Sequence, residues 1–153
     1  MSATDSDITT RKVDSAREDT EKISRQILDL STLDGKVTEP GPSVAPCSGK
    51  DSDKFYVIEH AWSVYDVPVP ELEQAMDRLK SELPKHGWEI TKDGSDSSKA
   101  KSREILANIP SKKISASMRL LDRRGRSKNP SMISVHLNST CLQVPDGDTV
   151  SPY

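Results

Sequence analysis

The sequence predicts an α+β domain: an antiparallel sheet of about four to five strands, with one main helix packed on one face and an additional N-terminal helix. Several segments alternate apolar and polar residues, as half-buried strands do. The segment 72–83 repeats its apolar residues with the period of a helix. The links between the later strands are short enough for antiparallel neighbours. With 153 residues, 33% hydrophobic and 30% charged, the chain has room for one modest domain.

The first predicted element is a helix in the N-terminal helical segment, residues 1–36. From about Asp7 to Leu30, apolar residues recur at three- to four-residue spacing, with Thr20 in the missing position. This apolar stripe is thin and partly polar. We therefore expect the helix to dock loosely on the domain or to pair with a partner.

A Pro-rich connector follows at residues 37–54. Pro40, Pro42 and Pro46 favour extended or turning backbone, and the segment offers little apolar surface. The connector carries Cys47 and is expected to lead into the α+β domain, residues 55–145.

The predicted domain begins with a long strand at 55–65, whose even-numbered residues form an apolar face that His60 interrupts. Pro70 suits the first turn of the main helix, whose apolar residues recur from Leu72 to Leu83. Further strands are predicted at 88–92, 104–109, 113–122 and 132–142, a solvated loop at Gly94–Ser102, and a disordered tail at 146–153.

Cys47 and Cys141 are the two cysteines of the chain, and they lie near the two ends of the region expected to fold. An even count in this placement favours a disulfide, which would stabilise a small domain and imply an oxidising compartment. The alternative interpretation is two separate buried thiols.

The N-terminal residues contain no apolar segment typical of a secretory signal. Cys47 follows Pro46 rather than the hydrophobic run that precedes a lipid-attachment cysteine, so lipidation there is not expected. The predicted location is extracytoplasmic, secreted or envelope-associated, if a signal lies upstream, and cytoplasmic otherwise. No apolar stretch reaches the roughly 18–20 residues of a transmembrane segment.

Basic residues are concentrated in one part of the chain. Residues 99–128 contain ten basic and two acidic side chains, although the formal net charge of the protein is -2. Such a concentration could bind an anionic polymer, a lipid headgroup or an acidic protein. The alternative is that these charges protect edge strands and balance acidic helices. The candidate anion- or partner-binding residues are Lys112, Lys113, Arg119, Arg123, Arg124, Arg126 and Lys128.

No catalytic, cofactor-binding or metal site is predicted. His60, His86 and His136 do not show a metal-ligand spacing, and the chain has no phosphate-binding glycine motif. Specific nucleic-acid binding is not expected, because the net charge is negative and few aromatic residues are present to stack on bases. An enzyme would require the loop Gly94–Ser102 to act as a lid over a polar pocket.

Two stretches of the chain resemble a known group of proteins. The runs FYVIEHAWSVYDVPVPELEQAMDRLKSELPKHGWEITKDGSDSSKAKS and SMISVHLNSTCLQVP are similar to small uncharacterised actinobacterial proteins of the extracytoplasmic, lipoprotein-like kind. The resemblance covers about Ser24 to Pro145. It implies an α+β domain outside the cytoplasmic membrane, bridged between Cys47 and Cys141, and it implies no reaction.

The sequence therefore predicts a non-enzymatic, secreted or cell-envelope-associated domain that binds a protein or an anionic envelope component. The alternative is a cytoplasmic interaction protein that uses the N-terminal helix and the basic strands to bind an acidic partner.

Overall fold

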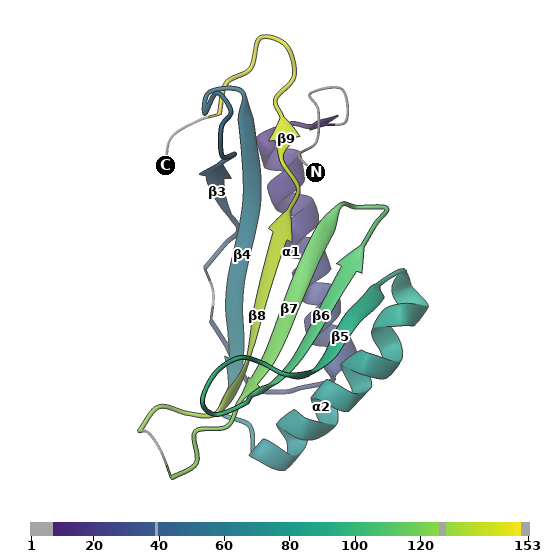
Figure 1. The fold of residues 1–153 in the computed structure, drawn as a ribbon, viewed down its shortest axis with the longest axis vertical. Helices are drawn as coiled ribbons and strands as arrows, with labels where there is room; N and C mark the ends of the chain where they lie inside the picture. Colours follow the sequence, from purple (N-terminus) through teal and green to yellow (C-terminus); the bar gives the residue numbers. More distant parts are fainter. Residues whose placement is uncertain (1–7, 39, 126–127, 151–153) are drawn as a thin grey trace.

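The computed structural model describes residues 8–38, 40–125 and 128–150 (Figure 1). Within these residues the chain forms one mixed sheet of nine strands, two α-helices and a 3₁₀ helix. The predicted fold class, an antiparallel sheet of about four to five strands with one main helix and an additional N-terminal helix, is therefore wrong. The strands that were missed have two to four residues, too few to show an alternating pattern.

Strand β4 (Phe55–Tyr65) organises the sheet. One of its edges pairs with β2 (Lys36–Val37) and β3 (Ser43–Pro46), which lie in or beside the Pro-rich connector. Its other edge pairs with β8 (Met132–Ser139) and β9 (Leu142–Gln143). The sheet is mixed because β1 (Thr9–Thr10) runs parallel to β9.

The rest of the sheet is an antiparallel meander. β5 (Glu89–Ser95), β6 (Arg103–Ile109) and β7 (Ile114–Leu121) follow one another and lead to β8, so the order beyond β4 is β8, β7, β6, β5. A register shift between Ile90 and Lys92 interrupts the β5–β6 ladder. β5 is the edge strand of this half.

Helix α1 (Val13–Ser31) is an integral part of the domain. Ile23 and Ile27 are buried in the main core, so the helix does not dock loosely as the sequence predicted. The helix ends at Thr32, whose φ of 54° lies in the left-handed region. The apolar stripe is thin because Thr20 and Ser24, both buried, occupy part of the face that contacts the sheet.

The second helix, α2 (Val69–Glu82), has Pro70 in its first turn, where the missing N–H costs nothing. It continues into the 3₁₀ helix η2 (Leu83–His86), which ends at Gly87 with a φ of 88°. Glycine adopts this conformation without strain, so the chain can reverse into β5.

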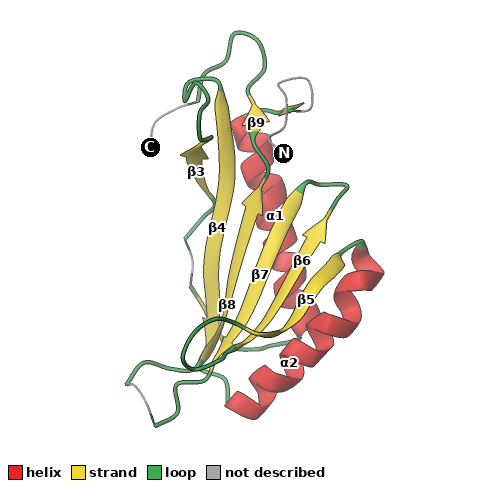
Figure 2. Ribbon diagram, in the orientation of Figure 1, coloured by secondary structure: helices red, strands yellow, loops and turns green. Residues whose placement is uncertain are grey.

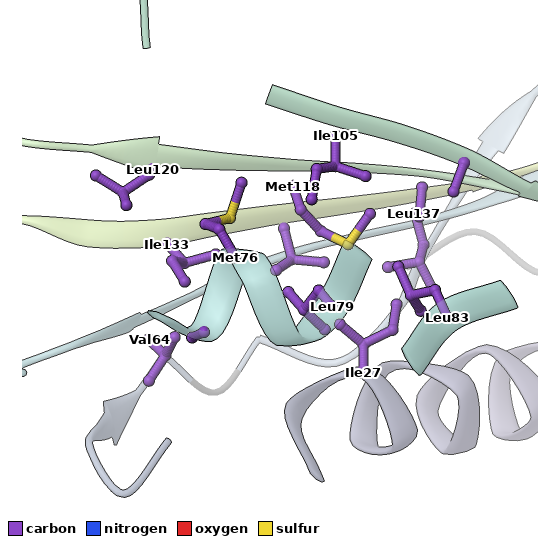
Figure 3. Close-up of a cluster of buried hydrophobic side chains, with 14 of the residues drawn as sticks. Ile27, Val64, Met76, Leu79, Leu83, Ile105, Met118, Leu120, Ile133 and Leu137 are labelled. Atoms are coloured by element: carbon purple, nitrogen blue, oxygen red, sulfur yellow. The ribbon is translucent and has the colours of Figure 1, made fainter. Parts of the chain in front are cut away.

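Both helices lie on the same side of the sheet (Figures 1 and 2). The core between them and the strands is divided into two clusters. In the larger cluster, side chains from both helices and the strands point toward one another, among them Ile27, Met76, Leu79, Met118 and Leu137 (Figure 3). The smaller cluster consists of Ala16, Tyr56, Ile58, Leu142 and Val144.

The opposite face of the sheet is not covered by a helix (Figure 2). Ser63, Ser134, Arg119 and Glu104 lie side by side across β4, β8, β7 and β6 on this face. We call it the open face.

The backbone after β9 is held against the segment before β4. Val144 donates its N–H to the carbonyl of Lys54, and Val150 donates to the carbonyl of Asp53. For residues 146–150 this pairing differs from the predicted disordered tail. Residues 151–153 lie outside the described residues.

Candidate functional site

Cys47 and Cys141 form a disulfide, which confirms the predicted pairing. The sulfur atoms are 2.10 Å apart and the Cα atoms 5.9 Å apart, a Cα separation usual for disulfides. Cys47 follows β3 and Cys141 lies between β8 and β9, and these neighbours pair with opposite edges of β4. The bond therefore ties the connector to the end of the meander.

The candidate basic residues fall into two groups at opposite ends of β7. β7 has eight residues, so a distance of roughly 27 Å separates its ends. Arg126 lies outside the described residues. The turn group, in the β6–β7 turn, contains Lys112 and Lys113; the loop group, at and beyond the end of β7, contains Arg119, Arg123, Arg124 and Lys128.

Acidic residues pair with two members of the loop group. Arg119 contacts the Asp96 carboxylate at 2.8 Å, and Arg124 contacts Asp122 at 2.8 Å. The Ser98 hydroxyl, together with Arg119, holds the pKa of Asp96 below its usual value. Asp96 precedes the basic stretch, so the fold brings together charges that are separated along the sequence.

The same carboxylate organises the predicted solvated loop. Asp96 accepts hydrogen bonds from the backbone N–H groups of Ser98 and Ser102 while it pairs with Arg119 on the open face. The loop is therefore held against the sheet. A hollow of about 360 Å³ lies beside it, between Lys101, Arg103 and β7.

The turn group stands beside a second hollow, which we call the turn-side hollow. It has a volume of about 340 Å³ and lies between the N-terminal half of α1, the sheet and the β6–β7 turn. Lys112 and Lys113 are exposed at its rim, and an ion pair between Arg11 and Asp19, 2.5 Å long, lies on its helix side. The apolar residues Ala16, Ile23, Ile58, Ile114 and Leu142 also line it.

A buried hydrogen-bond chain crosses the core near the middle of α1. The Nε2 atom of His60 lies 2.8 Å from the carbonyl oxygen of Pro40, and Nδ1 lies 2.7 Å from the Ser24 hydroxyl. A carbonyl only accepts, so Nε2 carries the proton; in the neutral ring, Nδ1 then accepts from Ser24. Ser24 and His60 are 4% and 7% exposed.

A third hollow lies on the other side of α1, next to this chain. We call it the His60 hollow; it has a volume of about 320 Å³ and is lined by Ser24, His60 and Trp62, with Glu21 and Arg25 at the helix. The Glu21–Arg25 ion pair is 2.6 Å long. The buried indole N–H of Trp62 has no hydrogen-bond partner in the described structure.

The Ser24–His60 pair has two of the three parts of a nucleophile–base arrangement, with a carbonyl in place of the orienting carboxylate. Ser24, however, lies inside α1, where backbone N–H groups donate within the helix and cannot stabilise an oxyanion. The geometry therefore suits a structural tether between α1, β4 and the segment before β3.

Sequence reasoning identified neither Ser24 nor this tether. Two signals were present: His60 interrupts the apolar face of β4, and Ser24 adjoins Ile23 in the apolar stripe of α1. Two polar residues on faces that must pack together indicate a buried polar contact. Their partnership could not be seen, because pairing across 36 positions requires the tertiary fold.

The other histidines lie apart from this tether. His86 ends η2 and is exposed, and His136 is exposed on β8. Among the described residues, no group of three or more His, Cys, Asp or Glu side chains could hold a metal ion. In the same residues no helix is long and apolar enough to span a membrane.

Comparisons with known proteins do not assign the chain to a class. No family model matches the sequence, no curated protein is similar to it, and no solved structure matches its fold. The function is therefore inferred from the geometry of the structure.

Proposed function

We propose that the chain is a non-enzymatic domain, secreted or associated with the cell envelope, that binds an anionic envelope component through basic side chains. The observation that carries this proposal is the Cys47–Cys141 disulfide. Disulfides persist in oxidising compartments and are rare where glutathione and thioredoxin keep thiols reduced. The disulfide disfavours the alternative of a cytoplasmic interaction protein.

The turn group supports the binding part of the proposal. Lys112 and Lys113 are adjacent and exposed, and they lie beside a hollow rather than on a flat surface. Lys113 donates from Nζ to the Thr9 hydroxyl at 3.1 Å, and in the loop group Arg119 and Arg124 are paired with carboxylates. Anion binding is therefore expected chiefly at the turn group.

The Ser24–His60 tether supports the non-enzymatic part. Both ring nitrogens of His60 are engaged within the protein, and the Ser24 hydroxyl is buried. A general base must reach the proton that it abstracts, and a nucleophile must reach its substrate. In this arrangement, a substrate can reach neither the ring nitrogens of His60 nor the hydroxyl of Ser24.

The compartment is tested on protein purified from its native host. Free thiols are alkylated before lysis, the protein is reduced, and the newly exposed thiols receive a second, heavier label. Mass spectrometry should find the heavy label on Cys47 and Cys141. The light label on both cysteines would refute the extracytoplasmic assignment.

Anion binding is tested by co-sedimentation with vesicles of phosphatidylglycerol, with phosphatidylcholine vesicles as the neutral reference. We expect binding to the anionic vesicles that weakens with salt. The Lys112→Glu/Lys113→Glu variant should lose this binding. Lys99→Glu/Lys101→Glu makes the same charge change at two exposed lysines of the β5–β6 loop and should retain it. Equal losses in the two variants would contradict a site at the turn group.

A further inference from the structure

The turn-side hollow lies where the two core clusters fail to meet. Along α1, Ala16 belongs to the smaller cluster and Ile23 to the larger one, with the polar Thr20 between them. Along β4, Ile58 belongs to the smaller cluster, and His60 separates it from the larger one. Polar residues thus interrupt apolar packing on both facing elements, and the hollow of about 340 Å³ lies beside this interruption.

Four large apolar side chains form part of the inner wall of this hollow. Ile23, Ile58, Ile114 and Leu142 contribute to it from α1, β4, β7 and β9, and all four are buried. They come from both core clusters. A hydrocarbon chain that enters therefore removes its own apolar surface from water, against side chains of the core.

Two polar side chains that line the hollow, Thr20 and Ser139, have hydrogen-bond partners within the protein. The Thr20 hydroxyl donates to the carbonyl of Ala16, at 2.8 Å. The Ser139 hydroxyl donates to the carbonyl of Thr140 and accepts the N–H of Ile58. A polar group that entered would lose water without gaining these partners, so the interior selects an apolar group.

The rim is cationic. Lys112 and Lys113 extend from the turn, Lys113 donates to the Thr9 hydroxyl at the same rim, and the Arg11–Asp19 pair beside them is internally neutral. Lys113 has a φ of 55°, a region in which glycine would be less strained. The rim and the wall together are complementary to a molecule with a negative head and an apolar tail.

We propose that the turn-side hollow binds a monomeric single-chain amphiphile with an anionic head, its chain between α1 and the sheet and its head at Lys112 and Lys113. A cavity of about 150 Å³ can hold benzene, so this hollow has room for a chain of roughly ten carbon atoms. The inference deepens the proposed function, on which it rests, by adding chain insertion to charge attraction.

The first test uses the unmodified protein and decanoate below its micelle concentration, in isothermal titration calorimetry. We expect binding of one decanoate per protein, with affinity that rises about fourfold for each methylene from hexanoate to decanoate. Decyltrimethylammonium, with the same chain and a positive head, should not bind. Absence of decanoate binding, or equal affinity for both heads, would overturn the proposal.

A second measurement locates the chain. Intermolecular nuclear Overhauser effects from the decanoate methylenes should reach the methyl groups of Ile23, Ile58 and Ile114, which line the hollow. Effects confined to residues of the His60 hollow would place the ligand elsewhere and refute this site. Light scattering must show a monomer, since a second copy of the chain that closed the hollow would equally overturn the assignment.

Variants separate the two parts of the site. Lys112→Glu/Lys113→Glu should weaken decanoate about tenfold or more, with Lys99→Glu/Lys101→Glu as the charge-matched control. Thr20→Met, which adds an unbranched side chain from the helix into the hollow, should shorten the preferred fatty acid. If phosphatidylglycerol vesicles bind while decanoate does not, the inference fails but the proposed function stands; if neither binds, both fail.

Discussion

Removing the Cys47–Cys141 bond should cost this domain much of its stability. The two cysteines are 94 positions apart. In the chain-entropy model, closing a loop of that length raises the free energy of unfolding by about 4.5 kcal/mol, because the bond restricts the unfolded chain. The total free energy of unfolding of a typical domain is only about 5–15 kcal/mol. Apart from the disulfide, the ends of the loop are held by the ladders of β3, β8 and β9 with β4.

The assay is urea unfolding of the oxidised and the reduced protein, followed by circular dichroism. With a slope of about 2 kcal/mol per molar urea, the midpoint should fall by about 2 M on reduction. Reduced protein retains both sulfur atoms, so the comparison isolates the bond; Cys47→Ala/Cys141→Ala should behave like the reduced form. A midpoint shift below about 0.5 M would refute the reasoning, because constraint of the unfolded chain would then contribute less than about 1 kcal/mol.

Three further substitutions follow from local geometry. Gly35→Ala should lower the free energy of unfolding by about 2 kcal/mol, because a Cβ atom there would clash with the Val67 side chain; an unchanged urea midpoint would contradict this. Thr32→Gly should raise the melting temperature by a few degrees, since a φ of 54° costs a β-branched residue about 1 kcal/mol; a lower melting temperature would show that the strain is not there. Hydrogen bonds from Arg103 hold the pKa of Asp93 below its usual value, so this pair stabilises the fold at neutral pH and its contribution is lost as the pH falls below about 4. Arg103→Met should therefore lose about 0.5–1 kcal/mol at pH 7 and show a weaker dependence of stability on acidic pH, whereas an identical pH profile would exclude the pair as its source.

The long elements of this fold were readable from the sequence. β4 spans the predicted residues 55–65, because eleven residues with one apolar face leave little doubt about period and length. The helix α2 was equally clear, since Pro70 marks its first turn and Gly87 marks the end of the 3₁₀ helix that follows it. The disulfide was also predictable, from the position of two cysteines at the ends of the folded region.

The short strands and the role of α1 were not readable. β2 and β3 form because the connector lies along a free edge of β4, and a backbone that pairs with an edge needs no side-chain pattern. α1 becomes part of the main core because α2 and β4 present apolar surface to Ile23 and Ile27. Its thin stripe, taken alone, suggested a weaker contact.

The sequence by itself determined which segments alternate or repeat with a helical period, which two thiols exist to be joined, and where basic residues are concentrated. The tertiary structure alone decided that Asp96 pairs with Arg119, that Ser24 contacts His60, and that Lys112 and Lys113 lie at the rim of a hollow lined in part by core residues. The physical reason is the distance along the chain between the residues that interact. Periodicity and turn chemistry act between neighbours in the chain, whereas charge pairing, burial and cavities depend on which distant segments the sheet brings together.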